Sequence, residues 1–221
     1  MDKLDDIREF RKLLRATLLV QRLAVTTDQR RQWNDAISHQ LITGFPFLQQ
    51  STIGIYWPYK GEYDPRFVMR EFRKGGAVSV LPVVVQKAAP LVFRKWWPGA
   101  PITKGAFGLP VPDGTAVLQP DALLIPPVGF DLEGYRLGYG GGYFDRTLAG
   151  LTPQPLKIGV AFELSRVQTI FPQPHDIPMD FIVTEAAVYH VSPGGLSKLQ
   201  DPRDATAIAE PVRSRRVGIL A

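Results

Sequence analysis

A glycine-rich segment between an arginine and an aspartate is the first feature of this chain that could do chemistry. It reads RLGYGGGYFD, from Arg136 to Asp145, and follows the apolar run DALLIPPVGF at 121–130. Glycine lets the backbone approach a ligand closely, and the N–H groups at a helix start bind anions. A strand, a glycine loop and a helix start therefore predict an anionic ligand such as a nucleotide phosphate. Arg136 would supply a cation, and Asp145 a carboxylate for a metal.

The loop matches neither of the two common phosphate-binding glycine patterns. A Walker A loop needs Lys-Ser or Lys-Thr after its last glycine, where this chain has Tyr143 and Phe144. The dinucleotide pattern fails at the same tyrosine. Because a glycine cluster can also be a plain turn, the sequence leaves both interpretations open at this point.

Other candidate groups are few. Asp180 is a possible second carboxylate for magnesium, which prefers hard oxygen ligands, although it precedes a predicted strand instead of following one. Glu62 follows a predicted strand and a tight turn, where a carboxylate can face a ligand or simply face solvent. Trp57 ends the same strand and is either a core residue or the wall of a pocket for a flat ring.

Two familiar kinds of catalytic site are excluded by residue type and spacing. The three histidines have no metal-ligand spacing, and the chain has no G-x-S-x-G segment and no cysteine. Zinc chemistry, Ser-His-Asp hydrolysis and disulfides are therefore not expected. Arg11 and Arg15 lie one turn apart on a predicted basic helix and could meet a phosphate together.

Length and charge set wider bounds. The 221 residues fit one compact domain, and the net charge of +5 with a pI near 9.5 suits anionic ligands. The N-terminus is charged throughout and does not read as a secretory signal. No segment approaches the roughly 20 apolar residues of a membrane span. We expect a cytoplasmic protein.

Hydrophobic periodicity predicts strands that alternate with helices. Helices are expected at 3–24, at 28–43, from Asp64-Pro65 to Gly75 and after the glycine loop; strands are expected at 52–57, 77–84, 91–97, around ALLIPPV, at 157–162 and within 180–191. This alternation predicts an α/β fold with an open, mostly parallel sheet flanked by helices. The segment 98–120 is expected to be loop. Residues 1–191 form the predicted domain, and 192–221 a flexible or surface-draped tail.

Four motifs in order resemble one family, the 5-formyltetrahydrofolate cyclo-ligases, also called 5,10-methenyltetrahydrofolate synthetases. The resemblance covers roughly residues 8–190, and its core is RLGYGGGYFDR at 136–146. The other motifs are YKGEYDP at 59–65, PPVGFD at 126–131 and HDIPMDFIVTE at 175–185. The resemblance implies a fold like that of ribose-phosphate isomerases and CoA transferases.

The resemblance also implies an activity. Such enzymes use ATP and magnesium to convert 5-formyltetrahydrofolate, free or polyglutamylated, to 5,10-methenyltetrahydrofolate, with release of ADP and phosphate. The formyl oxygen is phosphorylated, and N10 then closes the ring. Phosphoryl transfer depends on positioning and charge neutralisation, which fits the lack of a nucleophile constellation. A monomer that binds neither nucleic acid nor membrane is expected.

Site residues follow from the resemblance position by position. The expected ATP-binding residues are Arg11, Arg15, Arg136, Leu137, Gly138, Tyr139, Gly140, Gly141, Gly142, Tyr143 and Phe144. The expected substrate-binding residues are Trp57, Glu62, Tyr139, Gly140, Gly141, Gly142 and Tyr143. Arg136 and Tyr143 are expected to be catalytic, and Asp145 and Asp180 to bind magnesium. Arg11 stands where the family usually has lysine. The planar guanidinium of arginine contacts a phosphate in a different geometry from the compact ammonium of lysine.

Two other functions remain as alternatives. The same loop would serve another ATP-dependent small-molecule phosphotransferase. The basic pI and the sequence FRKWW at 93–97 would suit a nucleic-acid-binding protein, although no known motif of that class is present.

Overall fold

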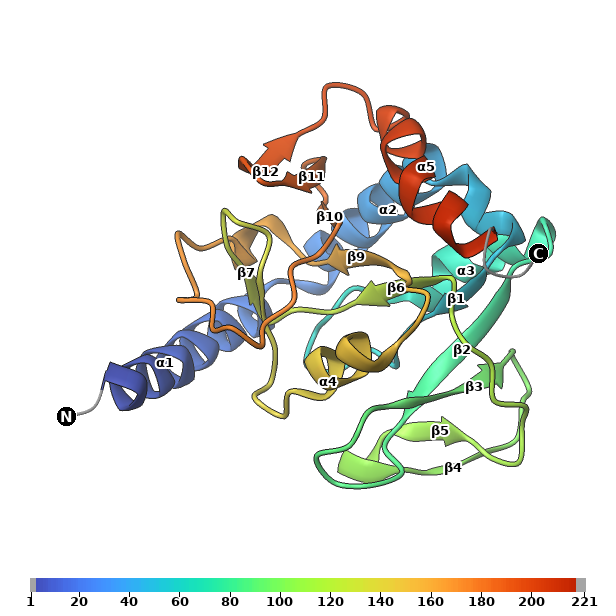
Figure 1. Ribbon diagram of the computed structural model, residues 1–221, viewed down its shortest axis with the longest axis horizontal. Coiled ribbons are helices and arrows are strands. Elements are labelled where there is room, and N and C mark those ends of the chain that lie inside the picture. The colour runs from blue at the N-terminus through green and yellow to red at the C-terminus, as the bar shows by residue number, and fades with distance from the viewer. Residues whose placement is uncertain (1–2, 218–221) are drawn as a thin grey trace.

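A computed structural model describes residues 3–217 of the chain. The fold is built around one eight-stranded sheet (Figure 1). Across the sheet the strands run β12 (Gly195–Lys198), β11 (Val188–Ser192), β10 (Phe181–Val183), β9 (Leu156–Val160), β6 (Ala122–Ile125), β1 (Thr52–Gly54), β2 (Val78–Val83) and β3 (Val92–Trp96). The five strands from β10 to β2 are parallel, and β3, β11 and β12 are antiparallel to their neighbours. The predicted open, mostly parallel α/β sheet is confirmed.

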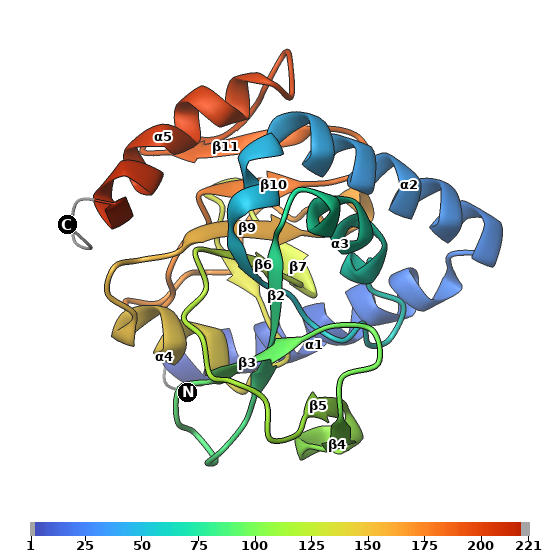
Figure 2. The same ribbon diagram turned by 90° about the vertical axis from the view of Figure 1, so that its right-hand side faces the viewer.

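Helices cover both faces of this sheet. The first face packs on α2 (Thr27–Gly44), α3 (Pro65–Lys74) and α5 (Asp204–Val217), through residues such as Leu41 and Phe72. The second packs on α4 (Tyr143–Gly150), through Leu148. Figure 2 shows α2, α3 and α5 together on one side. Each layer is therefore held by burial of apolar side chains against the central strands.

Local signals explain where the helices begin. Thr26 caps α2 by accepting a hydrogen bond from the backbone N–H of Gln29, and Asp64 caps α3 in the same way, with Pro65 at the first helical position. The predicted start and end of α3 are thus confirmed. It ends at Lys74, before a glycine pair.

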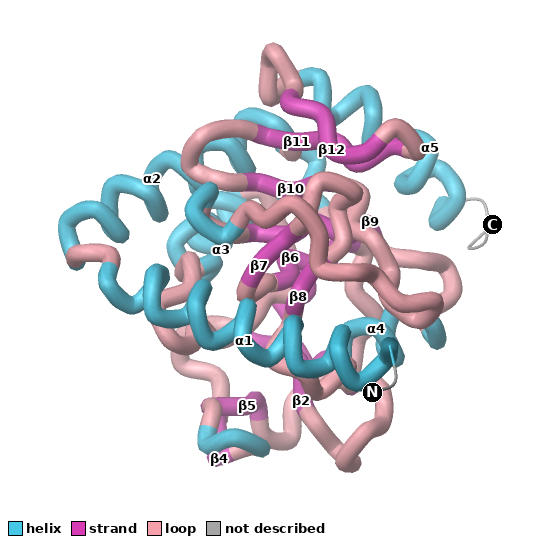
Figure 3. The backbone as a smooth tube through the Cα atoms, turned by 90° about the vertical axis from the view of Figure 1, so that its left-hand side faces the viewer, coloured by secondary structure: helices cyan, strands magenta, loops and turns pink. Residues whose placement is uncertain are grey.

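Helix α1 (Lys3–Ala24) does not lie flat on the sheet. Its Leu18 packs with Val128 and Leu137, which belong to the chain around the two-stranded ribbon β7 (Gly129–Phe130) and β8 (Arg136–Leu137). Figure 3 shows α1 passing beside β7 and β8. Ligands of open parallel sheets bind beyond the carboxyl ends of the strands, and α1 runs past the loops that leave β1 and β6 at that edge.

The structure corrects two expectations about connecting segments. The predicted loop at 98–120 contains a hairpin of β4 (Ile102–Lys104) and β5 (Pro110–Pro112), joined by a 3-10 turn at Ala106–Gly108. Prolines hid this hairpin, because proline is unfavourable in strands except at edges such as these. In addition, the predicted strand at 52–57 ends at Gly54, so Trp57 lies in a loop.

The segment after residue 191 is also more ordered than a flexible tail. Its described part forms β12 at the sheet edge and helix α5, which buries Ala205 and Ala209 completely. These alanines lie four residues apart and face α2 as one small stripe. Alanine contributes little to a hydrophobic pattern, so the sequence did not predict this helix. It does lie on the surface of the fold, and residues 218–221 are outside the described chain.

Candidate active site

The larger of two neighbouring cavities opens between the loop after β1, the β4–β5 hairpin and the glycine loop. It has a volume of about 590 Å³, and its walls are mainly aromatic and aliphatic. Trp57, Tyr59, Phe107, Tyr139 and Tyr143 contribute rings to it. A cavity of this size and lining fits a flat heterocyclic ligand.

Glu62 is a buried carboxylate in the wall of this cavity, only 7% exposed. Its Oε1 accepts a hydrogen bond of 2.8 Å from the Tyr139 hydroxyl, and its Oε2 accepts one of 2.9 Å from the backbone N–H of Tyr59. Burial raises the pKa of Glu62 to about 7, although Arg22 and these hydrogen bonds oppose the rise. The group therefore changes charge near neutral pH.

The glycine loop has the backbone that its sequence requires. Gly140 and Gly142 adopt φ angles of 95° and 62°, which side-chain-bearing residues rarely adopt. A Cβ on Gly142 would also lie 2.9 Å from the guanidinium of Arg146. Helix α4 begins at the next residue, Tyr143, as the strand–loop–helix pattern predicts.

Arg136 and Asp145, at the two ends of the glycine segment, form one ion pair. A guanidinium nitrogen of Arg136 donates to Oδ1 of Asp145 over 2.6 Å, and another donates to the Ile177 carbonyl over 2.6 Å. Burial lowers the pKa of Arg136 while Asp145 opposes this, and an arginine stays protonated in any case. The segment thus provides a fixed cation next to a carboxylate in the larger cavity.

A second cavity, of about 470 Å³, lies against the same loop. It is lined by Gly140, Gly141, Gly142, Asp145, Arg146, Ala149, Pro174, His175 and Ile177. Gly141, Gly142 and Asp145 line both cavities. The structure therefore brings the predicted phosphate loop between two spaces, with Asp145 accessible from each.

The two predicted cations of α1 have different surroundings. The Nε of Arg15 donates to the Gly138 carbonyl over 2.7 Å, and its guanidinium lies close to Gly140. Arg11 instead binds the segment at 170–176: it donates to the carbonyls of Ile170 and Phe171 and forms a 2.5 Å ion pair with Asp176. Arg15 is thus placed at the glycine loop, whereas Arg11 fixes a wall beside it.

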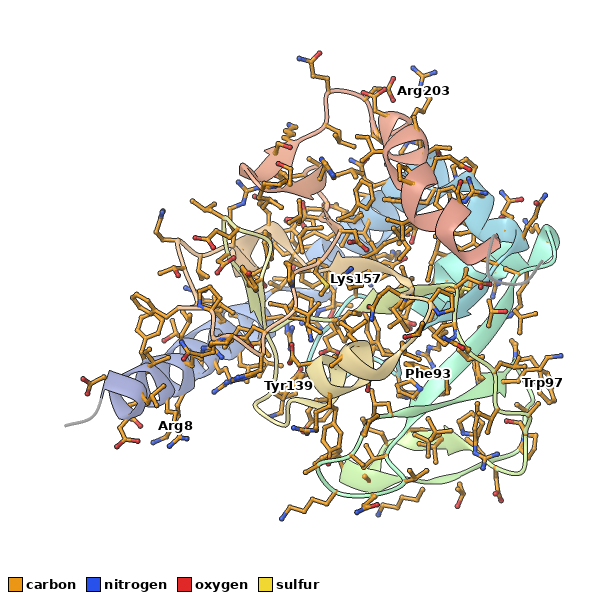
Figure 4. The ribbon with its side chains drawn as sticks, viewed as in Figure 1. Arg8, Phe93, Trp97, Tyr139, Lys157 and Arg203 are labelled. Carbon is orange, nitrogen blue, oxygen red and sulfur yellow. The ribbon has the colours of Figure 1, made fainter. Side chains whose placement is uncertain are left out.

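The structure does not bring Asp180 to the cavities. Its carboxylate accepts hydrogen bonds from the backbone N–H and the ammonium of Lys157, at the start of β9, and lines neither cavity. Figure 4 labels Lys157 among the central strands. Among the described residues, no group of three or more histidine, cysteine or acidic side chains is placed to hold a metal ion. The two predicted magnesium ligands therefore do not share one cavity.

Sequence reasoning missed two residues of the site. Phe107, at the tip of the β4–β5 hairpin, is 75% exposed, lines the larger cavity and lies edge-on to Tyr143 at 6.2 Å. Its signal was an aromatic between glycines in GAFG. Arg22 is buried next to Glu62, but in the sequence it looks like any other cation of a basic helix. Trp57, which was predicted, lines the cavity under the guanidinium of Arg66.

Two of the three aromatic residues in the sequence FRKWW at 93–97 belong to the core. Phe93 and Trp96 are buried, and Trp97 is exposed at the rim of the molecule (Figure 4). Buried rings are not available to stack on nucleic-acid bases.

Comparison with known proteins decides between the remaining alternatives. A sequence profile of the 5-formyltetrahydrofolate cyclo-ligase family matches residues 7–185. The chain belongs to the 5-formyltetrahydrofolate cyclo-ligase family. The 5-formyltetrahydrofolate cyclo-ligase of Escherichia coli K12 is 27% identical over an alignment of 178 residues, and the match covers 76% of this chain and 97% of that protein. The Mycoplasma pneumoniae enzyme is 29% identical and covers 78% and 96%.

Solved structures agree with this family membership. The 5,10-methenyltetrahydrofolate synthetase of Aquifex aeolicus superposes with a TM-score of 0.72 at 30% identity, covering 86% of this chain and 97% of that one. The synthetase from Mycoplasma pneumoniae gives 0.66 at 26%, covering 79% and 98%. The chain is therefore an ATP-dependent enzyme that converts 5-formyltetrahydrofolate to 5,10-methenyltetrahydrofolate. Within residues 3–217, no helix combines the length and hydropathy of a membrane span.

Proposed function

We propose that the two cavities divide the two substrates of the cyclo-ligase reaction between them. The larger, aromatic cavity binds the pterin of 5-formyltetrahydrofolate, and the smaller one binds the phosphates of ATP. The observation that supports this most is the shared wall: Gly141, Gly142 and Asp145 line both. A formyl oxygen and a γ-phosphate could approach each other there, because no side chain stands on the two glycines.

The proposed reaction has two steps. The formyl oxygen attacks the γ-phosphorus, so the bond between that phosphorus and the bridging oxygen breaks and ADP leaves. N10 then attacks the activated formyl carbon and loses its proton to solvent, the carbon–oxygen bond breaks, and phosphate leaves with the oxygen. Arg136 would neutralise charge on the transferring group, since its guanidinium is held in place by Asp145 and Ile177. Arg15, from α1, would add a second cation next to the loop.

Folate contacts are proposed for three kinds of residue. Glu62, as a carboxylate in a largely apolar wall, would accept hydrogen bonds from N–H groups of the pterin. Trp57, Tyr139 and Phe107 would contact its faces and edges, since all three line the cavity. Tyr143, the first residue of α4, lies between Phe107 and the glycines and would meet both substrates.

Magnesium is proposed as an ATP-bound ion that the protein contacts through Asp145. One carboxylate with phosphate oxygens and water is an ordinary magnesium environment. Asp145 fits, because it is the carboxylate that lines both cavities. Bound there, the ion would reduce the repulsion between phosphate oxygens. Asp180 was predicted as a second ligand, but its contacts with Lys157 do not support that role. A cytoplasmic location, a monomeric state and use of polyglutamylated folate stay predictions.

An absorbance assay tests the proposal. Protein, ATP, magnesium and 5-formyltetrahydrofolate should give the near-ultraviolet band of the methenyl product, and the band should not appear when ATP or magnesium is omitted. A non-hydrolysable ATP analogue should bind without product. Product without ATP would contradict the proposed phosphorylation. For the division of the cavities, Phe107→Ala should raise the folate KM and leave the ATP KM nearly unchanged, and the reverse would contradict it.

A further inference from the structure

Arg22 is an arginine with almost no contact with solvent, at 3% exposure, in the last turn of α1. Its Nε donates to the Lys60 carbonyl over 3.0 Å, and one terminal nitrogen donates to the Pro127 carbonyl over 3.2 Å. The other donates to the Tyr139 hydroxyl over 2.6 Å. A buried cation is stable only when such partners satisfy it. One guanidinium therefore ties together the loops after β1 and β6 and the glycine loop.

The Tyr139 hydroxyl connects this cation to the carboxylate of Glu62. It accepts the hydrogen bond from Arg22 and donates its own hydrogen to Oε1 of Glu62 over 2.8 Å. Arg22 itself lies 3.7 Å from the same oxygen. Because both Arg22 and Glu62 are buried, their attraction is weakly screened.

The other groups around Glu62 do not replace this cation. Tyr59 contacts the carboxylate through its backbone N–H, and the buried hydroxyl of Tyr56 donates to the Tyr63 carbonyl. Burial raises the pKa of Glu62, and Arg22 is the largest influence that lowers it. Without Arg22, burial would favour the neutral carboxyl group more strongly.

We propose that Arg22 is a positioning residue for the cyclo-ligase reaction, which aims the carboxyl group of Glu62 at the folate cavity and holds Tyr139 of the glycine loop against it. Arg22 lines neither cavity, so it acts through these two residues. The loop that the two cavities share is thereby anchored to the folate-binding carboxylate. This inference rests on the proposed function of the larger cavity.

Steady-state kinetics over a range of pH test the inference. Arg22→Gln should raise the folate KM about 10-fold, with a smaller change in the ATP KM. The acidic limb of kcat/KM for folate, which reports protonation of Glu62 in the free enzyme, should move up by about one pH unit. Arg22→Lys should recover part of both changes, because it restores the charge without the planar fork.

Two further variants separate positioning from a merely structural role. Arg30→Lys is the matched control: Arg30 donates to the carbonyls of Arg22 and Val25 but makes no contact with Glu62. Arg30→Lys should at most lower the thermal stability of the protein, and the acidic limb of kcat/KM for folate should stay at the wild-type pH. Tyr139→Phe removes only the connecting hydroxyl and should shift the limb in the same direction as Arg22→Gln. A double variant with both Arg22→Gln and Tyr139→Phe should then shift the limb little further than Arg22→Gln alone.

The outcomes are distinguishable. Wild-type protein that makes no methenyl product would refute the proposed function. If the wild type is active but Arg22→Gln has the wild-type folate KM and the wild-type acidic limb of kcat/KM, the inference about Arg22 is refuted and the proposed function stands. If Arg22→Gln does not fold, Tyr139→Phe and Arg22→Lys decide, and wild-type behaviour of both would overturn it.

Discussion

Arg136 donates to Oδ1 of Asp145 over 2.6 Å, so the proposed phosphate cation and the proposed metal carboxylate form one ion pair at the entrance to helix α4. Nine positions separate the two residues, and the four glycines lie between them. The carboxylate thus has two tasks in the proposed mechanism: it aims a guanidinium, and it faces an ion.

Substitutions at Asp145 should separate these tasks. Asp145→Asn keeps an oxygen for Arg136 but removes the charge, so kcat should fall about 100-fold and more magnesium should be needed. Asp145→Ala also removes the hydrogen-bond acceptor of Arg136, so kcat should fall further than in Asp145→Asn. Magnesium titrations of the initial rate measure both.

Asp180→Asn is the matched control for these variants. It removes the ion pair with Lys157 and should cost stability without altering the magnesium requirement. If instead it raised that requirement as much as Asp145→Asn, Asp180 would belong to the metal site after all.

The stability of the protein should depend on pH through Glu62. Its pKa is about 7 in the fold and 4.5 as a free side chain. Between these values the unfolded chain has lost a proton that the folded chain keeps, so stability should fall as pH rises from about 4.5 to about 7 and then level off. The total is about 3 kcal/mol at 1.36 kcal/mol per unit.

Urea denaturation of Glu62→Gln against wild type isolates this contribution. The glutamine variant should lack the fall, and the difference between the two proteins should be confined to that pH window. Glu133→Gln, at an exposed position, serves as the control and should follow wild type. Parallel curves for all three proteins would show that Glu62 titrates normally.

Arg11 should act on the wall of the smaller cavity and not on phosphate directly. Arg11→Ala and Asp176→Ala should each raise the ATP KM severalfold, because the segment at 170–176 loses its anchor. In a double-mutant cycle on unfolding free energy the two should couple by about 1–3 kcal/mol. Additive effects would mean that the ion pair contributes nothing.

Arg11→Lys distinguishes the two possible roles. Lysine stands here in most of the family according to the sequence resemblance, and it would suit a direct phosphate contact. In this chain it cannot donate to two carbonyls and Asp176 in the same planar arrangement. We therefore expect a higher ATP KM for Arg11→Lys, and a lower one would favour direct contact.

The C-terminal helix should contribute to stability and not to catalysis. Ala209→Asp places a charge at a fully buried position between α5 and α2, so the unfolding free energy should fall by about 3 kcal/mol or more. KM values for both substrates should stay within twofold, about 0.4 kcal/mol in binding. Ala207→Asp, at an exposed position near the start of the same helix, is the matched control and should leave the Tm nearly unchanged.

Motifs made the sheet and the glycine loop predictable, whereas contacts between distant segments did not show in the sequence. The positions of Gly140 and Gly142 in a tight loop could be predicted because glycine readily adopts the positive φ angles found there. Arg22 was not, since its three acceptors come from loops that only the fold brings together. Asp180 was assigned through the family motif, but its position before β10 already argued against the cavity edge, and the structure shows it bound to Lys157.

The shared wall of the two cavities also suggests a route to inhibitors. Gly141 and Gly142 line both the aromatic cavity and the smaller one. A bisubstrate compound, with a folate-like ring joined to a phosphonate, could cross at that point with a short linker. Any substituent at Gly142 that blocked this crossing would also strain the loop on which turnover depends, because Gly142 has a positive φ angle.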